Sequence, residues 1–282
     1  ENQWGFVDFN RPMVAINQWE QAADSMYTLC GKDRIHPSTD GHLVMAYLFL
    51  KAQGLAGKPV ADIRIDGAGK KVTRSDNCRV SDLSVSSDNL TFTYEAKSLP
   101  YPIDTSYYDN EKHTQADALS VIPFMDEMNY EGLSVSGLSD GYYGLTIGGE
   151  FIGRFTAREL ERGINMALLQ NTPQYKQAMK IRQMNEERWL KERKMREFYW
   201  VEYNLMRKTG MLWACNEAAV DTLRKYRPHD IFLQWNGDLW LQYMHKGIRE
   251  DCVNEQQDLV NQIYEQNKPI PLRIEIKKFT DL

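Results

Sequence analysis

Apolar positions divide the chain into stretches with different periodicities. Residues 42–53 are apolar on nearly every side of a helical projection, which predicts a buried helix that ends at Gly54. Residues 60–66 and 90–94 instead alternate apolar and polar side chains, the period of a half-buried strand. The same reasoning predicts further strands at residues 133–138, 142–147 and 151–155, with Gly148 and Gly149 forming the hairpin between the last two.

The last part of the chain has helical periodicity. Thr156 and Glu159 form a capping-box pattern, which opens a helix predicted to continue through residue 169. Pro173 begins a second helix, predicted to run to about Lys208 because neither glycine nor proline interrupts it. We also predict helices at residues 216–226 and 239–266 and a closing strand at residues 273–276.

These patterns predict three parts. Residues 1–57 have α/β character, because a short apolar strand is predicted at residues 4–9, ahead of the buried helix. Residues 58–155 form a β-rich segment, in which residues 101–113 are predicted to be a loop. Residues 156–282 form a helical extension with the closing strand.

Charge and length exclude several classes of protein. The chain has 282 residues with 34 Lys and Arg against 39 Asp and Glu, so its net charge of -5 does not favour binding to nucleic acid. Its longest apolar run, residues 43–50, is much shorter than the roughly 20 residues that a membrane-spanning helix needs. No signal peptide is visible, and the start at Glu1 rather than Met leads us to expect a processed or excised product.

Residues 33–42 contain the most informative motif, an aspartate and a histidine three residues apart in a predicted loop. A serine hydrolase needs a histidine that takes the proton from its nucleophile, and an acceptor that fixes the histidine tautomer and stabilises the imidazolium. Asp33 and His36 can supply both functions from one short turn, which Pro37 stiffens. The alternative is that both are ordinary loop residues, with Asp33 capping a turn.

Two other patterns have simpler explanations. Residues 137–141 are Gly-Leu-Ser-Asp-Gly, which matches the Gly-x-Ser-x-Gly pattern of a nucleophile elbow. That elbow needs a helix after the serine, whereas a strand is predicted after Ser139. We therefore interpret this segment as a hairpin turn. Asp33, His36, Asp40 and His42 are close in sequence, yet the two histidines lack the i, i+4 spacing of a helical zinc pair, so neither a metal nor a cofactor is predicted.

The four cysteines, Cys30, Cys78, Cys215 and Cys252, are far apart and lack zinc-type spacing. Two interpretations remain open, namely four buried thiols or one disulfide in an oxidising compartment, for which Cys30 and Cys78 are the best pair. Cys30 is interpreted as structural rather than as a nucleophile. His113, His229 and His245 are isolated in sequence and are assigned no role.

The block around His36 resembles the last conserved block of the SGNH hydrolases, also called GDSL-type esterases and lipases. The shared features are Asp-Arg-Ile-His-Pro at residues 33–37, Gly41-His42, and an apolar helix carrying Met45-Ala46. The predicted strand at residues 4–9 fits the last core strand of that fold, so the resemblance covers residues 1–57. Residues 129–133 and 172–175 are similar, more loosely, to the carboxyl-terminal extension of certain bacterial SGNH-like proteins.

This resemblance implies a flavodoxin-like, three-layer α/β hydrolase portion that is incomplete at its N-terminus. In the family, a serine within Gly-Asp-Ser attacks an ester carbonyl, while a glycine N–H and an asparagine side chain hold the oxyanion. By the resemblance, His36 is the general base and Asp33 is its orienting partner. The implied substrate is an acyl or acetyl ester, with an acylated carbohydrate as one option, and the implied location is extracytoplasmic, either periplasmic or secreted.

The chain departs from the family pattern in one respect. The family has its serine, glycine and asparagine blocks upstream of the Asp-x-x-His block, and no Gly-Asp-Ser occurs in this sequence. We therefore expect the chain to be the carboxyl-terminal part of such an enzyme, with the nucleophile on a missing N-terminal segment. The chain alone is expected to be inactive.

The alternative function is a non-catalytic module that binds a glycan or a protein, or acts as a scaffold. Residues 198–200 and 235–243 are rich in aromatic side chains, which can stack on sugars but more often pack between helices. The charged stretch at residues 182–197 has the composition of a solvated helix face with i, i+4 ion pairs rather than that of a nucleic-acid patch.

Overall fold

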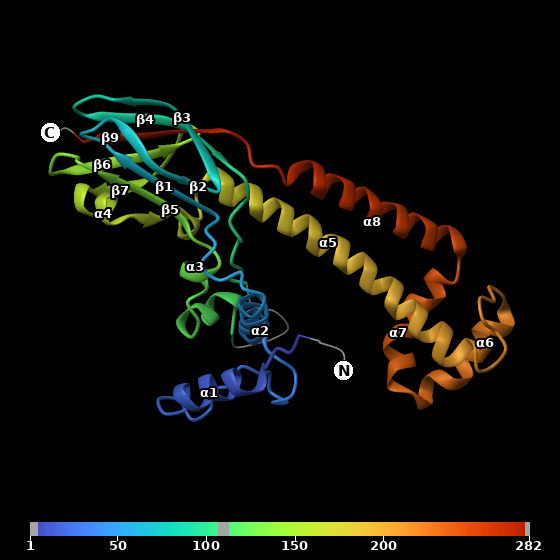
Figure 1. The fold of residues 1–282 in the computed structure, drawn as a ribbon. Coiled ribbons are helices and arrows are strands. Elements are labelled where there is room, and N and C mark those ends of the chain that lie inside the picture. The colour runs from blue at the N-terminus through green and yellow to red at the C-terminus, as the bar shows by residue number, and fades with distance from the viewer. Residues whose placement is uncertain (1–4, 107–112, 280–282) are drawn as a thin grey trace. The chain divides into compact units, whose positions relative to one another are not determined.

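A computed structural model of the chain describes residues 5–106 and 113–279, and Figure 1 shows its fold. Within these residues the chain divides into two compact units. Unit 1 comprises the chain up to Ala178 together with the segment from Lys268 onward, and unit 2 is Met179–Asn267. The division differs from the predicted boundaries, because residues 156–178 and the closing strand belong to unit 1.

Unit 1 contains two β-sheets (Figure 1). The four-stranded sheet consists of β1 (Ala61–Asp66), β2 (Lys71–Asp76), β5 (Glu131–Ser136) and β8 (Ile164–Asn165). The five-stranded sheet consists of β3 (Cys78–Val85), β4 (Asn89–Ala96), β6 (Tyr142–Ile147), β7 (Glu150–Thr156) and β9 (Leu272–Lys278). Their strand orders are β2-β1-β5-β8 and β3-β4-β9-β6-β7. The predicted strands at residues 60–66, 90–94, 133–138, 142–147, 151–155 and 273–276 are confirmed, with small shifts at their ends.

The two sheets share one apolar core. Ile63 and Leu133 from the four-stranded sheet and Phe92, Leu145 and Ile276 from the five-stranded sheet are all at least 99% buried and belong to one cluster. Their positions follow the two-residue period of a strand that has one face in the core. The last strand, β9, inserts between β4 and β6, so the end of the chain completes a core that residues 60–166 begin.

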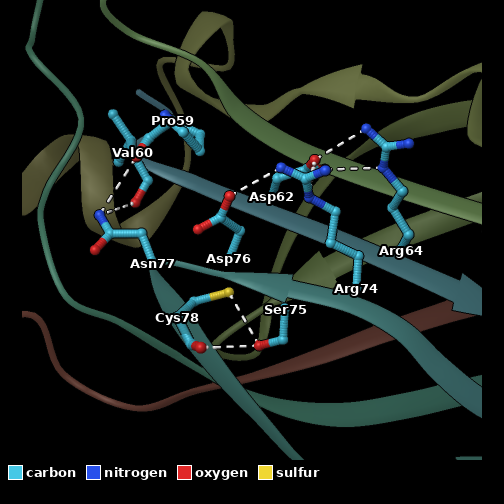
Figure 2. Close-up of polar contacts among 9 residues, drawn as sticks. All are labelled: Pro59, Val60, Asp62, Arg64, Arg74, Ser75, Asp76, Asn77 and Cys78. Carbon is cyan, nitrogen blue, oxygen red and sulfur yellow. Dashed lines mark hydrogen bonds and ion pairs between the residues drawn. The ribbon is translucent and has the colours of Figure 1, made fainter. Parts of the chain in front are cut away.

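Neither β2 nor β3 is predicted by apolar periodicity. β2 is polar except for Val72 and lies at the edge of its sheet, where exposed polar side chains are tolerated. Asn77 connects it to β3 with a left-handed backbone φ of 52°, and its side-chain amide donates to the carbonyl oxygens of Val60 at 2.9 Å and Pro59 at 3.3 Å (Figure 2). The Asn77 side chain therefore hydrogen-bonds the backbone just before β1 from the turn between β2 and β3.

Asp62 on β1 is a buried carboxylate that two arginines neutralise (Figure 2). Its Oδ2 lies 3.0 Å from Arg64 Nη2 and 2.8 Å from Arg74 Nε, and Arg74 Nη2 also lies 2.8 Å from Asp76 Oδ2. The cluster contains two positive and two negative side chains, so it ties β1 to β2 without leaving an excess charge for a ligand.

Two helices, α1 (Asn10–Glu20) and α2 (Thr39–Ala52), precede the sheets. α2 confirms the helix predicted at residues 42–53, whereas α1 is unpredicted and has no buried residue. The strand predicted at residues 4–9 is wrong for residues 5–9, which form no strand, and Trp4 lies outside the described residues. Phe6 is 85% exposed, and no strand in the described ranges lies beside this segment to pair with its backbone.

α2 packs on two short helical segments that lie between β4 and β5 in the chain. These are a 3-10 helix (Gln115–Ser120) and α3 (Phe124–Glu127), which share a second apolar cluster with α2. Residues 101–106, the described start of the predicted loop, have no regular structure, and residues 107–112 of that prediction lie outside the described residues. The predicted capping box is confirmed, because Glu159 N–H donates to Thr156 Oγ1 at 3.1 Å. Its helix, α4 (Ala157–Arg162), ends before residue 169, since Gly163 turns the backbone out of the helix with a φ of 95°.

Unit 2 is helical. Its elements are α5 (Pro173–Val201), whose first turns belong to unit 1, a π-helical turn (Glu202–Met206), α6 (Glu217–Tyr226), a 3-10 turn (Arg227–His229), α7 (Ile231–Tyr243) and α8 (Lys246–Gln266). The helices predicted from Pro173 and at residues 216–226 are confirmed. The helix predicted at residues 239–266 is confirmed in its extent and its end, but a break at Met244 and His245 divides it between α7 and α8, and α7 already begins at Ile231.

The described residues therefore have a mixed α/β fold, with two sheets and a helical carboxyl-terminal region. Within them, β1 and β5 form the only parallel strand pair, so the flavodoxin-like three-layer arrangement implied by the resemblance is not seen in residues 5–106 and 113–279. No helix in these ranges is both long and apolar enough to cross a membrane.

Candidate active site

The Asp33–His36 motif lies in a small closed loop ahead of α2. An isolated bridge pairs Cys30 with Pro37, and the Gly31 N–H donates to the His36 carbonyl at 2.8 Å. The Ser38 N–H donates to the Leu29 carbonyl at 3.0 Å and closes the base of the loop. The backbone therefore fixes both ends of the motif.

Asp33 organises the turn inside this loop. Its Oδ1 accepts hydrogen bonds from the backbone N–H groups of Ile35 at 2.9 Å and His36 at 3.1 Å, which is an Asx-turn geometry. Its Oδ2 lies 2.6 Å from His36 Nδ1. Arg34, between them, has a left-handed φ of 57°. The sequence prediction that this spacing brings the carboxylate to the imidazole therefore agrees with the geometry.

The electrostatics of the pair favour an ionised carboxylate. The hydrogen bond from His36, with smaller contributions from the two backbone N–H groups, lowers the pKa of Asp33 to about 2. Both groups are accessible, since the His36 side chain is 83% exposed and that of Asp33 is 47% exposed. Nδ1 faces the carboxylate, and no described residue bonds to Nε2, which leaves the second nitrogen accessible to another molecule or segment.

α2 starts directly against the loop. A Cβ added to Gly41 would lie 2.0 Å from the Leu29 carbonyl oxygen and 3.3 Å from Pro37 Cβ. Only a glycine allows the helix to approach the Leu29 backbone this closely, and Leu29 is itself fully buried. Gly41 therefore sets the distance between α2 and the Asp33–His36 loop.

We expect Gly41→Ala to destabilise unit 1 by about 1–3 kcal/mol, because the added methyl group must displace either α2 or the loop base. Urea unfolding followed by circular dichroism measures the effect. Gly5→Ala is the control, because it inserts a methyl group where nothing lies within 4 Å and where the backbone is not left-handed. A destabilisation by Gly41→Ala no larger than that of the control would contradict the close-packing argument.

The other titratable residues of the motif do not join the Asp33–His36 pair. Asp40 is 99% buried, accepts a hydrogen bond from Ser38 Oγ, and its Oδ2 lies 3.4 Å from His113 Nδ1. His42 is exposed on α2. Of the four residues considered as metal ligands, Asp33 pairs with His36, Asp40 instead contacts His113, and His42 joins neither pair. No group of three or more such ligands occurs in the described ranges. The contact of Asp40 with His113 has no signal in the sequence, because a polar residue 73 positions away is brought to it only by the fold.

The Gly-Leu-Ser-Asp-Gly segment is not a nucleophile elbow. It joins β5 of one sheet to β6 of the other, so the predicted hairpin turn is wrong, but a strand does follow it, as expected. Ser139 Oγ lies 3.1 Å from Tyr143 Oη and accepts a hydrogen bond from Lys278 Nζ at 2.8 Å. No histidine contacts this hydroxyl among the described residues, so it is not part of a Ser–His pair.

All four cysteines are free thiols, so the disulfide alternative for Cys30 and Cys78 is not formed. Cys78 and Cys252 are buried, as the thiol interpretation expects, whereas Cys30 is half-buried and Cys215 is exposed. Cys215 Sγ lies 3.4 Å from His245 Nδ1 in unit 2. Sequence alone gives no indication of this contact, because the two residues are 30 positions apart in separate connecting segments.

The aromatic-rich segments of unit 2 contribute to both its core and its surface. Phe198 and Trp240 are fully buried, which agrees with the packing interpretation, while Tyr199 and Trp235 are 39% and 66% exposed. Buried Glu202, in the π-helical turn, accepts hydrogen bonds from Trp240 Nε1 and the Trp213 N–H, each at 2.8 Å. These bonds satisfy the buried carboxylate, so we assign it a structural role.

Comparisons with known proteins relate both units to an enzyme. Residues 179–268, which contain the whole of unit 2, match the family model of the diltiazem deacetylase C-terminal helical domain. Over 99% of its length the chain is similar to a solved structure described as BT4096, a gut microbial diltiazem-metabolizing enzyme, with 42% sequence identity and a TM-score of 0.93. The chain spans 63% of the length of that structure. No curated protein matches the chain.

Proposed function

We propose that this protein is a serine ester hydrolase of the SGNH type, in which His36 is the general base and Asp33 orients it. The observation that carries the proposal is the 2.6 Å contact between Asp33 Oδ2 and His36 Nδ1 on an imidazole that is 83% exposed. A histidine held at one nitrogen by a carboxylate and open at the other has the arrangement that a general base requires.

In the proposed reaction, His36 Nε2 takes the proton from a serine hydroxyl while the serine oxygen attacks the ester carbonyl carbon. The imidazolium then returns this proton to the alkoxy oxygen as the carbon–oxygen bond of the ester breaks, and an acyl-serine remains. A water molecule releases the acyl group by the same steps, with His36 again as base. Asp33 stays ionised throughout, because its pKa of about 2 is far below neutral pH, and it stabilises the imidazolium.

The serine of this mechanism is proposed to lie outside these 282 residues. The sequence has no Gly-Asp-Ser, and the hydroxyl of its one elbow-like serine, Ser139, faces Tyr143 and Lys278. The chain spans 63% of the solved structure that it resembles, so a nucleophile on a further segment is compatible with that likeness. Such a segment would also have to supply any strands of a three-layer hydrolase core.

An acetyl ester is the proposed substrate class. The likeness of residues 179–268 to a diltiazem deacetylase domain supports an acetyl group more directly than a longer acyl chain. The match of the chain with a diltiazem-metabolizing enzyme supports the same assignment at the level of the whole fold. The alcohol part of the natural ester is left open by both.

Active-site labelling of the complete protein tests the proposal. We expect a fluorophosphonate to abolish hydrolysis of a chromogenic acetate ester and to modify one serine that is not among these 282 residues, as mapped by peptide mass spectrometry. Heat-denatured protein serves as the control and should not be labelled. Labelling of Ser139, or full turnover after labelling is complete, would overturn the assignment.

A further inference from the structure

The outer face of the five-stranded sheet carries an aromatic and cationic patch at β6, β7 and β9, strands that lie side by side in Figure 1. Gly144 on β6 pairs with Arg154 on β7 and with Lys277 on β9, so these three residues form one row across the sheet. Tyr143 and Leu145, on either side of Gly144, point into the core. By strand alternation, the row of Gly144 therefore faces away from the core.

Gly144 is the floor of this patch. A Cβ at Gly144 would lie 3.2 Å from both the Phe151 and the Phe279 rings, so these rings close over the glycine. They meet edge to face, with their centroids 6.5 Å apart. Together with Tyr142 they remain accessible, since Tyr142, Phe151 and Phe279 are 47%, 60% and 43% exposed. Three large rings exposed in one place on a sheet are more than scattered surface residues would give.

Arg154 is held between two of these rings. Its guanidinium carbon lies 3.7 Å from the Tyr142 ring centroid and 5.3 Å from that of Phe279. Stacking of this kind fixes the plane of the guanidinium while leaving its N–H groups on the edge available. Arg154 is exposed and has no ion pair or side-chain hydrogen bond in the part of the chain that the structure describes.

Arg154 and Lys277 give the patch two positive charges, and neither forms an ion pair among the described residues. Lys277 is exposed and, within residues 5–106 and 113–279, is also without an ion pair. Of the acidic side chains next to the patch, Glu150 is ion-paired with Lys176. Glu275, on the same face of β9 as Lys277, accepts a hydrogen bond at 2.9 Å from the neutral Asn89 amide rather than from a cation. This arrangement contrasts with the Asp62 cluster, in which each arginine faces a carboxylate.

We propose that the patch formed by Tyr142, Gly144, Phe151, Arg154, Lys277 and Phe279 binds an acidic saccharide, that is, a sugar chain containing a uronate. The fixed guanidinium of Arg154 offers two parallel N–H donors to a carboxylate, which is the geometry of a bidentate pair. The exposed rings offer apolar faces to the C–H surface of a pyranose. Neither the assignment nor its test requires the catalytic role of His36, since the patch residues are on different elements from the Asp33–His36 loop.

Charge and size favour this ligand over a nucleic acid. Two unpaired cations on a chain with a net charge of -5 cannot follow a phosphate backbone over several nucleotides. A single carboxylate needs one fixed guanidinium, and the second cation, at Lys277, lies two strands away on the same row. A neutral sugar would leave both cations unused.

Calorimetric titration with trigalacturonate, using maltotriose as the neutral comparison, tests the proposal. We expect the acidic trisaccharide to bind and Arg154→Ala to weaken this binding at least about tenfold, because the bidentate pair is lost. Phe151→Ala should weaken it about 3- to 10-fold through lost ring contact. Arg79→Ala, which removes an arginine of the same sheet that is already paired with Glu95, is the matched control and should bind normally.

Any of three outcomes would overturn the proposal. The first is that trigalacturonate does not bind at about 10 mM, a concentration at which even weak sites are occupied. The second is that maltotriose binds equally well, and the third is that Arg154→Ala binds trigalacturonate with unchanged affinity. Circular dichroism of each variant verifies that the sheet is intact. As a second variant, Arg154→Lys keeps the positive charge but lacks the two parallel N–H donors of the guanidinium, so its affinity should lie between those of Arg154→Ala and wild type.

Discussion

Replacing His36 with alanine is expected to lower kcat/KM of the complete protein for a short-chain acetate ester by about 10²- to 10⁴-fold, the usual contribution of a general base. The loss should appear in catalysis and not in folding. The side chain is 83% exposed, and its one described partner is Asp33. Turnover of a chromogenic acetate and the midpoint of thermal unfolding, measured on the same preparation, separate the two effects.

Two companion variants sharpen this experiment. His42→Ala removes an exposed histidine from α2, six positions along the chain, and should leave kcat/KM unchanged. Asp33→Asn replaces an acceptor with a group that can donate to Nδ1, which stabilises the wrong tautomer of His36, so it should lower the rate and alter its pH profile. If His36→Ala retains the wild-type rate, or if His42→Ala loses as much as His36→Ala, His36 is not the base.

Local signals explain why the Asp33–His36 geometry could be predicted from the sequence. The two residues are three positions apart, and the contact forms inside one Asx turn whose hydrogen bonds all lie within residues 33–36. α2 is likewise predictable, because its apolar residues span nearly the whole helix. Neither inference depends on residues that are distant in the sequence.

Elements that form only through contacts between distant residues could not be predicted from the sequence. α1 has no fully buried residue, and only its Met13 and Ile16 pack, half-buried, against the α2 cluster, so its apolar stripe is too short to predict an amphipathic helix. β3 contains a register shift between Ser81 and Ser84, with Asp82 at a left-handed φ of 53°, which breaks the alternation expected of a strand. Residues 5–9 have the composition of a strand, but a strand exists only where a neighbour accepts its backbone hydrogen bonds.

The aromatic patch likewise could not be predicted from the sequence, because its residues lie on or next to three strands. Tyr142, Arg154 and Phe279 meet because β9 enters the sheet beside β6, a pairing between residues that are 127–135 positions apart. The aromatic segments that the sequence emphasised are in unit 2, where Phe198 and Trp240 form core. Aromatic content along the chain therefore does not indicate the patch, and only the strand register shows which of its side chains share a face.

Because of Glu131, we expect the unfolding free energy of unit 1 to decrease as the pH rises from about 5 to 8. This glutamate is fully buried at the start of β5, and burial raises its pKa from 4.5 to about 7, partly offset by hydrogen bonds from Tyr94 Oη at 2.8 Å and Gln174 Nε2 at 3.2 Å. Below pH 4.5 both the folded and the unfolded chain hold the proton, so burial carries no ionisation cost. As the pH rises from 4.5 to 7, the unfolded chain releases this proton first, and stability falls.

The gap between a pKa of 4.5 and one of about 7 corresponds to roughly 3 kcal/mol of unfolding free energy, fully lost above pH 7. Glu131→Gln removes the ionisation and keeps an acceptor for Tyr94. It also supplies N–H donors near the Gln174 amide oxygen, a buried atom without a hydrogen-bond partner among the described residues. The variant should therefore be nearly independent of pH in this window and more stable than wild type at pH 8 by about 1–3 kcal/mol.

Urea unfolding at pH 5 and pH 8, monitored by circular dichroism, measures the difference. Glu161→Gln, which changes an exposed glutamate on α4, is the matched control and should keep the wild-type pH response. Asp33 does not interfere, because its pKa of about 2 confines its contribution to more acidic solutions. Parallel pH responses in wild type and Glu131→Gln would mean that Glu131 is already ionised at pH 5 in the folded protein, and that its hydrogen bonds from Tyr94 and Gln174 fully offset the cost of burying the charge.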